Sequence, residues 1–150
     1  MPEPLVRPPT PADRDALLAL MDAYIVGFYH APRPPRERLE ALVGLLAEGD
    51  EGAQLVVEVD AGRLLGFATL YFTWSTLRAD RIAILNDLYL DDRARGTGAA
   101  TALFQGARAL ARERGCTEME WQTAADNQRA QAFYAKMGGK RGDWVSYSIG

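Results

Sequence analysis

Apolar and polar residues follow two spacings along this chain, and the spacings divide it into helices and strands. Helical spacing of apolar residues predicts amphipathic helices at about 11–28, 36–47, 97–114 and 127–137, the last with Asp126 as a possible cap. Alternation and short apolar runs predict strands at 5–7, 54–59, 64–73, 82–90, 116–124 and 143–149. The second and third strands form a hairpin that breaks at Ala61-Gly62. Because helices and strands are interspersed, we predict a mixed α+β fold.

Composition bounds the class of protein. The chain has 150 residues and 48% hydrophobic content, so we expect a single domain over residues 1–150. A formal charge of -3 predicts no nucleic-acid and no membrane partner. Cys116 is the only cysteine, which rules out a disulfide within the chain. Met1-Pro2-Glu3-Pro4 has no signal-peptide pattern and no apolar run is long enough to span a membrane, so we expect a cytoplasmic protein.

The stretch from Ile84 to Ala111 joins an apolar strand, the loop Arg93–Gly98 and an alanine-rich helix. Gly96 and Gly98 would let backbone N–H groups approach a ligand closely, and the helix start adds unpaired N–H groups and a positive dipole end. Thr101 stands where a Rossmann fingerprint needs its third glycine, and no P-loop lysine follows. The pattern therefore predicts either a phosphate-binding turn or a tight turn with solvated arginines.

A second segment, Asn127 to Gly138, makes the pattern specific. Together the two stretches resemble the GNAT superfamily of acetyl-CoA-dependent N-acetyltransferases, and most closely its diamine (spermidine/spermine-like) branch. The first family signature, Gln/Arg-x-x-Gly-x-Gly/Ala, is matched by Arg95, Gly98 and Ala100, although a register starting at Arg93 also fits. The second signature is matched by Asn127, Ala130, Phe133, Tyr134 and Gly138. The resemblance implies a mostly antiparallel, twisted sheet of about 6–7 strands with a splayed parallel pair and about four flanking helices.

The resemblance also implies how acetyl-CoA binds. Backbone groups of Leu88 and Leu90 would hold the pantetheine arm as an added strand would, and the pyrophosphate would rest on the amides from Arg95 to Thr101. No metal is implied. The complete set of predicted cofactor-binding residues is Leu88, Tyr89, Leu90, Arg95, Gly96, Thr97, Gly98, Ala99, Ala100, Thr101, Asn127, Ala130, Phe133 and Tyr134.

Acetyl transfer to an amine needs a proton donor for the leaving thiolate and a proton acceptor for the ammonium. By the resemblance, Tyr134 is the donor. In the diamine branch a central-strand glutamate collects the amine's proton, and here Asn86 takes that catalytic position without being able to act as a base. Asp87 should point to the opposite face of the strand. Glu120 and Asp91 are other candidates, and a surface role is open for each.

We predict an N-acetyltransferase for a primary amine of a small molecule, with an amino acid or simple amine favoured over a polyamine. The alternatives are a peptide or protein N-acetyltransferase and a non-catalytic acyl-CoA-binding sensor. Tyr24 and Tyr29 could line the acceptor pocket or be core aromatics. The family leads us to expect a homodimer. The predicted substrate-binding residues are Tyr24, Tyr29, Trp74, Asn86 and Glu120.

Overall fold

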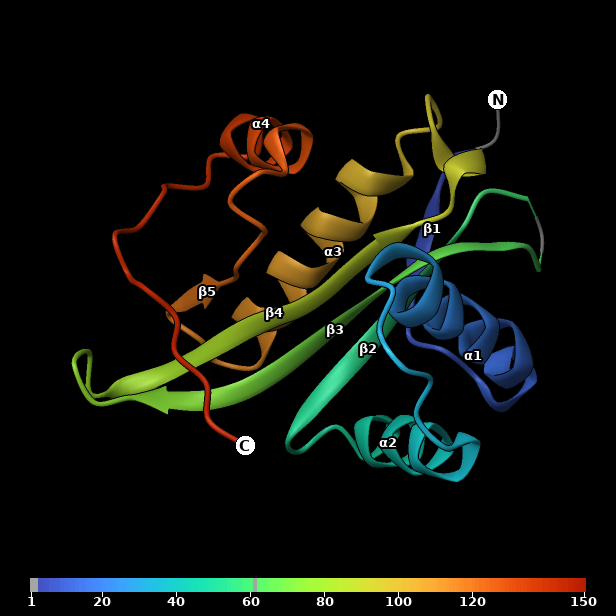
Figure 1. The fold of residues 1–150 in the computed structure, drawn as a ribbon, viewed down its shortest axis with the longest axis horizontal. Coiled ribbons are helices and arrows are strands. Elements are labelled where there is room, and N and C mark those ends of the chain that lie inside the picture. Colours follow the sequence, from blue (N-terminus) through green and yellow to red (C-terminus); the bar gives the residue numbers. More distant parts are fainter. Residues whose placement is uncertain (1–2, 61) are drawn as a thin grey trace.

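A five-stranded sheet forms the centre of the protein (Figure 1), whose computed structural model describes residues 3–60 and 62–150. The strands lie in the order β1-β2-β3-β4-β5, with antiparallel pairing from β1 to β4 and a parallel β4–β5 pair. Their bounds are Leu5–Arg7, Gly52–Glu58, Leu64–Ser75, Asp80–Leu90 and Glu118–Glu120. The predicted mixed α+β class and the mostly antiparallel pairing are confirmed. Ala61, in the predicted hairpin break, lies outside the described residues.

Four α-helices flank the sheet, as predicted. Their bounds are α1 Arg14–Asp22, α2 Arg36–Glu48, α3 Ala99–Glu113 and α4 Gln128–Lys136. Short 3-10 turns occupy Pro11–Asp13 and Asp92–Ala94, and a π-helix, Ala23–Phe28, continues α1. The helix predicted at about 11–28 is therefore three consecutive segments of different winding.

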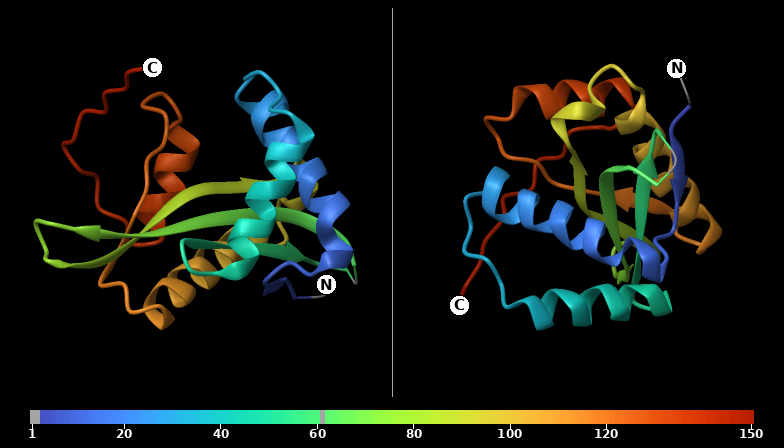
Figure 2. Two further views of the ribbon diagram at one scale, coloured as in Figure 1. Left: turned by 90° about the horizontal axis from the view of Figure 1, so that it is seen from below. Right: turned by 90° about the vertical axis from the view of Figure 1, so that its right-hand side faces the viewer.

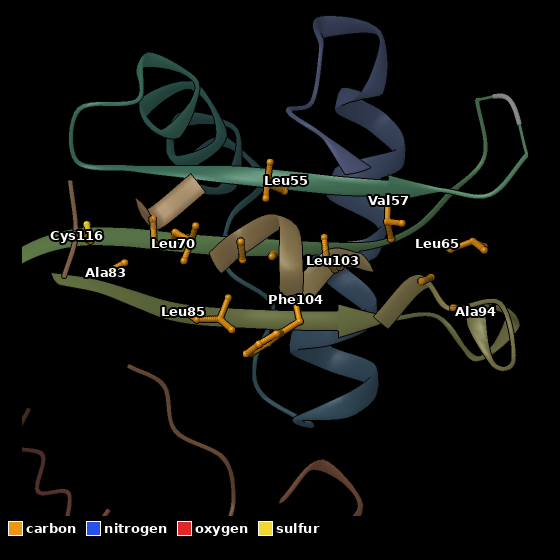
Figure 3. Close-up of a cluster of buried hydrophobic side chains, with 14 residues drawn as sticks. Leu55, Val57, Leu65, Leu70, Ala83, Leu85, Ala94, Leu103, Phe104 and Cys116 are labelled. Carbon is orange, nitrogen blue, oxygen red and sulfur yellow. The ribbon is translucent and has the colours of Figure 1, made fainter. Parts of the chain in front are cut away.

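The sheet separates two hydrophobic cores. On one face α3 packs over the middle strands, with Leu103 and Phe104 against Leu70 and Leu85 (Figure 3). On the other face α1 buries Leu17 and Met21 against Phe67. The close approach of α3 depends on its small residues: a Cβ at Gly106 would come within 2.7 Å of Val6 Cγ1.

The central strand β4 carries a bulge at Asn86. Leu85 lies opposite Leu70 and Asp87 lies opposite Thr69, so Asn86 is an extra residue in the strand. The bulge interrupts the alternation of side chains. Asp87 consequently shares the α1 face of the sheet with Thr69, and its Oδ1 atom accepts a hydrogen bond of 3.1 Å from Asn86 Nδ2. The simple alternation that placed Asp87 on the face opposite Asn86 does not hold here.

The two parallel strands separate just before this bulge. The pairing of β4 with β5 ends at Ile84 and Glu120, whereas β4 continues for six residues to Leu90. The amide of Asp91 donates to Leu65 O on β3, and alternation then directs the backbone groups of Leu88 and Leu90 toward the gap left by β5. The predicted splayed pair is present.

In residues 3–60 and 62–150 the sheet has five strands, fewer than the 6–7 predicted. The strand predicted at 116–124 is regular only at Glu118–Glu120, and residues 143–149 form no strand. Trp144 and Tyr147 of this segment are 90% and 94% exposed. Figure 2 shows the end of the chain leaving the body of the sheet. Alternation of apolar and polar residues is present in this segment, but a strand also needs a pairing partner.

Candidate functional site

The turn that leads into α3 has the geometry of an anion-binding nest. Gly96 and Gly98 both have left-handed backbone angles, with φ values of 72° and 81°, which explains glycine at both positions. The Ala99 amide donates to Thr97 Oγ1 and the Ala102 amide to Gly98 O. The amides between them, at Ala100 and Thr101, have no hydrogen-bond partner among the described residues. They are the groups that this turn can offer to a phosphate.

The two arginines of the loop differ in their surroundings. Arg93 is engaged by Asp91, with the Arg93 Nη2 to Asp91 Oδ2 distance at 3.0 Å, and this pair lowers the pKa of the Asp91 carboxyl. Arg95 is exposed and has no ion-pair partner in the described part of the chain. Arg95 is therefore the arginine of the two whose guanidinium remains available to an anion, and the choice between the two registers of the first signature stays a prediction. Asp91 is already engaged as an acceptor, which weakens it as a candidate base.

Helix α4 places Tyr134 beside the splay. Asn127 begins the helix, since its Oδ1 atom accepts the Ala130 amide at 3.0 Å, and Asp126 is not the cap. The Tyr134 ring packs 5.3 Å from Trp121 and 6.3 Å from Phe104, measured between ring centroids. Burial, with a smaller contribution from Tyr29, raises the pKa of Tyr134. The phenol is thus held in its protonated form at neutral pH, as a proton donor requires.

Across the sheet, Asp87 lies among tyrosines. Burial chiefly raises the pKa of Tyr24, and the Asp87 charge adds to the increase. The pKa of Tyr71 is raised by the same two causes in the same order. In the β3–β4 register Tyr71 lies opposite Ile84, and Thr69 lies opposite Asp87. The side chains of Tyr71, Thr69 and Asp87 therefore share the α1 face of the sheet. Alternation along β3 could have identified Tyr71, whereas the bulge that brings Asp87 here has no sequence signature.

The remaining predicted acceptor residues are placed differently. Tyr29 is half-exposed, packs against Tyr24 at 5.0 Å between ring centroids, and is close enough to Tyr134 to affect its pKa. Glu120 is largely exposed at the splay. A hydrogen bond with Glu118 is the main cause that raises the pKa of Glu120, and partial desolvation adds to the increase. Trp74 is 72% exposed near the tip of the β3–β4 hairpin and projects from the face of β3 that carries Phe72, opposite Tyr71.

Tyr24, Tyr29 and Asp87 thus lie together on the α1 side, and Tyr29 is close enough to Tyr134 to affect the pKa of Tyr134, whereas Trp74 projects from the α3 face near the hairpin tip. These site assignments stay predictions. Among residues 3–60 and 62–150, no group of three or more His, Cys, Asp and Glu could hold a metal ion. No helix in the same residues is long and apolar enough to cross a membrane, and the cytoplasmic location stays a prediction.

A nest at a helix start, a splayed strand pair and a second helix with a partly buried phenol together indicate a class of protein. Residues 17–139 match the model of the Acetyltransferase (GNAT) family. The chain therefore belongs to the GNAT family of acetyltransferases, whose enzymes use acetyl-CoA. The particular resemblance to the diamine branch stays a prediction.

Individual relatives agree with this class. The chain is 34% identical over 99 residues to the uncharacterized N-acetyltransferase YhfO of Bacillus subtilis, covering 66% of each chain. It is 30% identical over 83 residues to the D-amino-acid N-acetyltransferase HPA3 of Saccharomyces cerevisiae, covering 55% of this chain and 52% of the relative. The chain thus spans about half to two thirds of the length of these curated relatives.

A solved structure shows the same fold over the whole chain. The aminoglycoside N-acetyltransferase AAC(6′)-Iy in complex with CoA superimposes with a TM-score of 0.83 at 16% identity, covering 99% of this chain and 95% of that one. The chemistry of the residues present here suits CoA. Unpaired backbone amides and the exposed Arg95 side chain suit a pyrophosphate. The open edge of β4 suits an extended chain with amide groups.

Proposed function

We propose that this protein transfers the acetyl group of acetyl-CoA to the primary amine of a small molecule. The observation that supports the proposal is that Asp87 lies on β4 beyond its last pair with β5, close to Tyr24, while Tyr29 beside Tyr24 is close enough to Tyr134 to affect the pKa of Tyr134. When bound, acetyl-CoA supplies an activated thioester. The protein's own residues bind and orient it and move two protons.

Backbone groups of this chain would hold the cofactor. The amides of Ala100 and Thr101 and the guanidinium of Arg95 would bind the pyrophosphate, and the edge groups of Leu88 and Leu90 would hold the pantetheine arm. The Oδ1 atom of Asn127 is occupied by its helix cap, so only its Nδ2 atom is available to the arm. This arrangement directs the arm from the nest toward Tyr134.

Tyr134 would donate its hydroxyl proton to the departing sulfur, because its raised pKa keeps the proton on the oxygen until a thiolate forms nearby. Asp87 would accept the proton of the attacking ammonium, directly or through one water. Asn86 cannot accept that proton, and its amide instead donates to the Asp87 carboxylate at 3.1 Å and so orients it. This division of roles replaces a glutamate at position 86 with an Asn86–Asp87 pair.

The role of Asp87 predicts a particular pH profile. In Asp87→Asn no carboxylate collects the proton, so kcat/KM at pH 7 should fall by about 10²–10⁴-fold. The loss should shrink as the pH rises toward the pKa of the amine itself, since an amine that arrives neutral needs no base. A variant whose loss is equally large from pH 6 to 10, with acetyl-CoA binding intact, would instead mark Asp87 as a structural residue.

The acceptor that we propose is an amino acid or simple monoamine rather than a polyamine. A second ammonium group needs a second carboxylate. The carboxylate positions of the diamine branch fall on Asn86 and on or near Ser75, and both residues are neutral. Glu120, the carboxylate exposed at the splay, is hydrogen-bonded to Glu118, which raises its pKa. Glu118 is neutralised by Arg78, with 2.7 Å between Oε2 and Nη2. The D-amino-acid N-acetyltransferase among the relatives agrees with this choice. We expect kcat/KM for spermidine to lie about 10²–10⁴-fold below that for the best monoamine.

The test is the release of free thiol from acetyl-CoA across a panel of amino acids, monoamines, polyamines and peptides, together with calorimetric binding of CoA. Turnover with a small amine supports the proposal. Turnover with peptides alone would make the protein a peptide N-acetyltransferase. Binding of CoA without turnover on any amine would make it an acyl-CoA sensor.

We also propose a homodimer in which residues 143–149 pair with a second copy. Trp144, Val145, Tyr147 and Ile149 are 77–99% exposed, and β5 is an edge strand. Such a row of exposed apolar residues is unusual on a monomer. Sedimentation should give a dimer, and Tyr147→Lys should give a monomer with unchanged secondary structure. A wild-type monomer at micromolar concentration would overturn this proposal without touching the catalytic one.

A further inference from the structure

The π-helix Ala23–Phe28 gathers three aromatic rings on one side of the helix. The Tyr29 amide donates to Tyr24 O at 3.1 Å, a hydrogen bond that spans five residues instead of four. In an α-helix Tyr29 would lie about 140° around the axis from Tyr24, because each residue turns the chain by about 100°. Because a π-turn contains more residues than an α-turn, Tyr29 lies on the same side of the helix as Tyr24, and Phe28 lies on that side too.

The ring geometry shows the consequence. Ring centroids are 6.3 Å apart for Tyr24 and Phe28, which are nearly parallel, and 5.0 Å apart for both Tyr24–Tyr29 and Phe28–Tyr29, which meet edge to face. We call these three residues the aromatic wall. π-helical turns are rare, and they occur frequently at functional sites.

The wall has a buried side and an open side. Tyr24 packs against Phe67 at 5.6 Å and Tyr89 at 5.7 Å, which fixes the wall on β3 and β4. Phe28 and Tyr29 are 52% and 54% exposed. Two adjacent aromatic rings that remain half-open to water form an apolar surface without a partner in the described chain, and such surfaces mark binding sites.

The ends of the wall locate it in the proposed active site. Asp87 lies near Tyr24, and Tyr29 lies near Tyr134, so the wall extends from the proposed proton acceptor toward the proposed proton donor. A molecule bound on the open faces of Phe28 and Tyr29 could therefore place an ammonium group at Asp87. The wall itself offers ring faces and phenol groups and no carboxylate.

We propose, resting on the proposed function, that the wall selects the acceptor: a primary amine whose remainder is a flat aromatic ring, such as an arylalkylamine or an aromatic amino acid. The ammonium group is held by Asp87 and the ring stacks on Phe28 and Tyr29. Aromatic pairs gain from both area burial and ring geometry, and an aliphatic acceptor of the same charge lacks the ring geometry.

The experiment compares matched amines that differ in one ring. Wild-type kcat/KM should be about 10–100-fold higher for phenethylamine than for propylamine, and similarly for phenylalanine over alanine. Phe28→Ala should lower this ratio at least about threefold, and Phe28→Leu should lower it less. Leu77→Ala, which removes an 87% exposed side chain in the β3–β4 turn, is the control and should leave the ratio unchanged.

Binding of the same amines to the CoA-bound protein gives a readout that does not need turnover. A preference for phenethylamine in binding that Phe28→Ala removes supports the inference even where turnover is absent, in which case only the proposed activity fails. Equal use and equal binding of the aromatic and aliphatic amines would overturn the inference and leave the activity standing. A Phe28→Ala protein with an unchanged ratio and an altered sedimentation coefficient would overturn it too, because the rings would then cover a second copy.

Discussion

The two faces of β4 carry the two halves of the proposed site, and they are built in different ways. The face toward α3 holds Leu85, Leu88 and Leu90 in a continuous core, and the strand leads into a turn whose ligand groups are backbone amides. The face toward α1 holds Asp87 and Tyr89, and its ligand groups are side chains.

Backbone irregularity is what separates the two halves. The cofactor half needs only glycines with positive φ and a helix start, which are features of local sequence. The acceptor half depends on the bulge at Asn86 and on the π-helix Ala23–Phe28, both of which break the regular period of their elements. In this chain the cofactor half is therefore encoded in a short motif, whereas the acceptor half depends on the register of its elements.

The largest effect that would sharpen this comparison is expected at Tyr134, which contacts the α3 core and faces the acceptor half. Tyr134→Phe keeps the ring packing on Trp121 and removes only the proton donor. We expect kcat to fall by about 10²–10⁴-fold with little change in CoA affinity. Tyr147→Phe, at a 94% exposed tyrosine, is the matched control and should be silent. Near-normal turnover under conditions where chemistry is rate-limiting would remove Tyr134 from the mechanism.

The turn of the cofactor half could be predicted from the sequence for the same physical reason, and its binding of CoA stays a prediction. The left-handed angles at Gly96 and Gly98 restrict the residue type, so the pattern Arg95-Gly96-Thr97-Gly98 carries the geometry of the turn. Strands β1 to β4 were also predicted to within a few residues, and β2, β3 and β4 were predictable because each has at least one buried face.

The acceptor half could not be predicted to the same depth. Period-two alternation assigns Asp87 to the wrong face because it takes the strand as unbroken, and one bulge inverts every assignment after it. Helical spacing likewise takes Tyr24 and Tyr29 as widely separated around an α-helix. The last predicted strand at 143–149 failed for another reason: its pattern is correct, but pairing is a property of the neighbouring chain and not of the segment.

The next effect in size concerns the free energy of unfolding, which a substitution should lower more in the α3 core than in the acceptor half. Leu103 is fully buried on α3, and Leu103→Ala should cost about 2–5 kcal/mol of unfolding free energy through the cavity that it leaves. Phe28 on the acceptor side is 52% exposed, and Phe28→Ala should cost about 1 kcal/mol or less. Urea unfolding measures both. A loss at Phe28 as large as that at Leu103 would mean that the aromatic wall is core and is not kept open for a ligand.

The nest can be tested by a substitution that favours the helix and disfavours the ligand. A carboxylate in the first turn of α3 interacts well with the helix dipole, so Ala100→Glu should fold normally. The same charge should repel the pyrophosphate and weaken CoA binding about 10–100-fold, roughly the value of one charge-assisted hydrogen bond. Ala100→Gln has nearly the same size without the charge, and calorimetry should give a much smaller loss. Equal losses in the two variants would point to steric hindrance alone.

The smallest effect is expected for the arginine side chain beside the nest. Arg95 is exposed, and an exposed ion pair contributes about 0.2–1 kcal/mol, so Arg95→Ala should weaken CoA binding only about two- to fivefold. The loss should shrink further at high ionic strength, because salt screens an exposed charge. Arg93→Ala is the matched control, since Arg93 already binds Asp91 and should contribute less. Calorimetric titration of CoA into each variant at low and high salt measures these losses. If Arg95→Ala instead weakens binding as strongly as Ala100→Glu, the side chain and not the backbone is the main pyrophosphate ligand, and the cofactor half would be built from side chains as the acceptor half is.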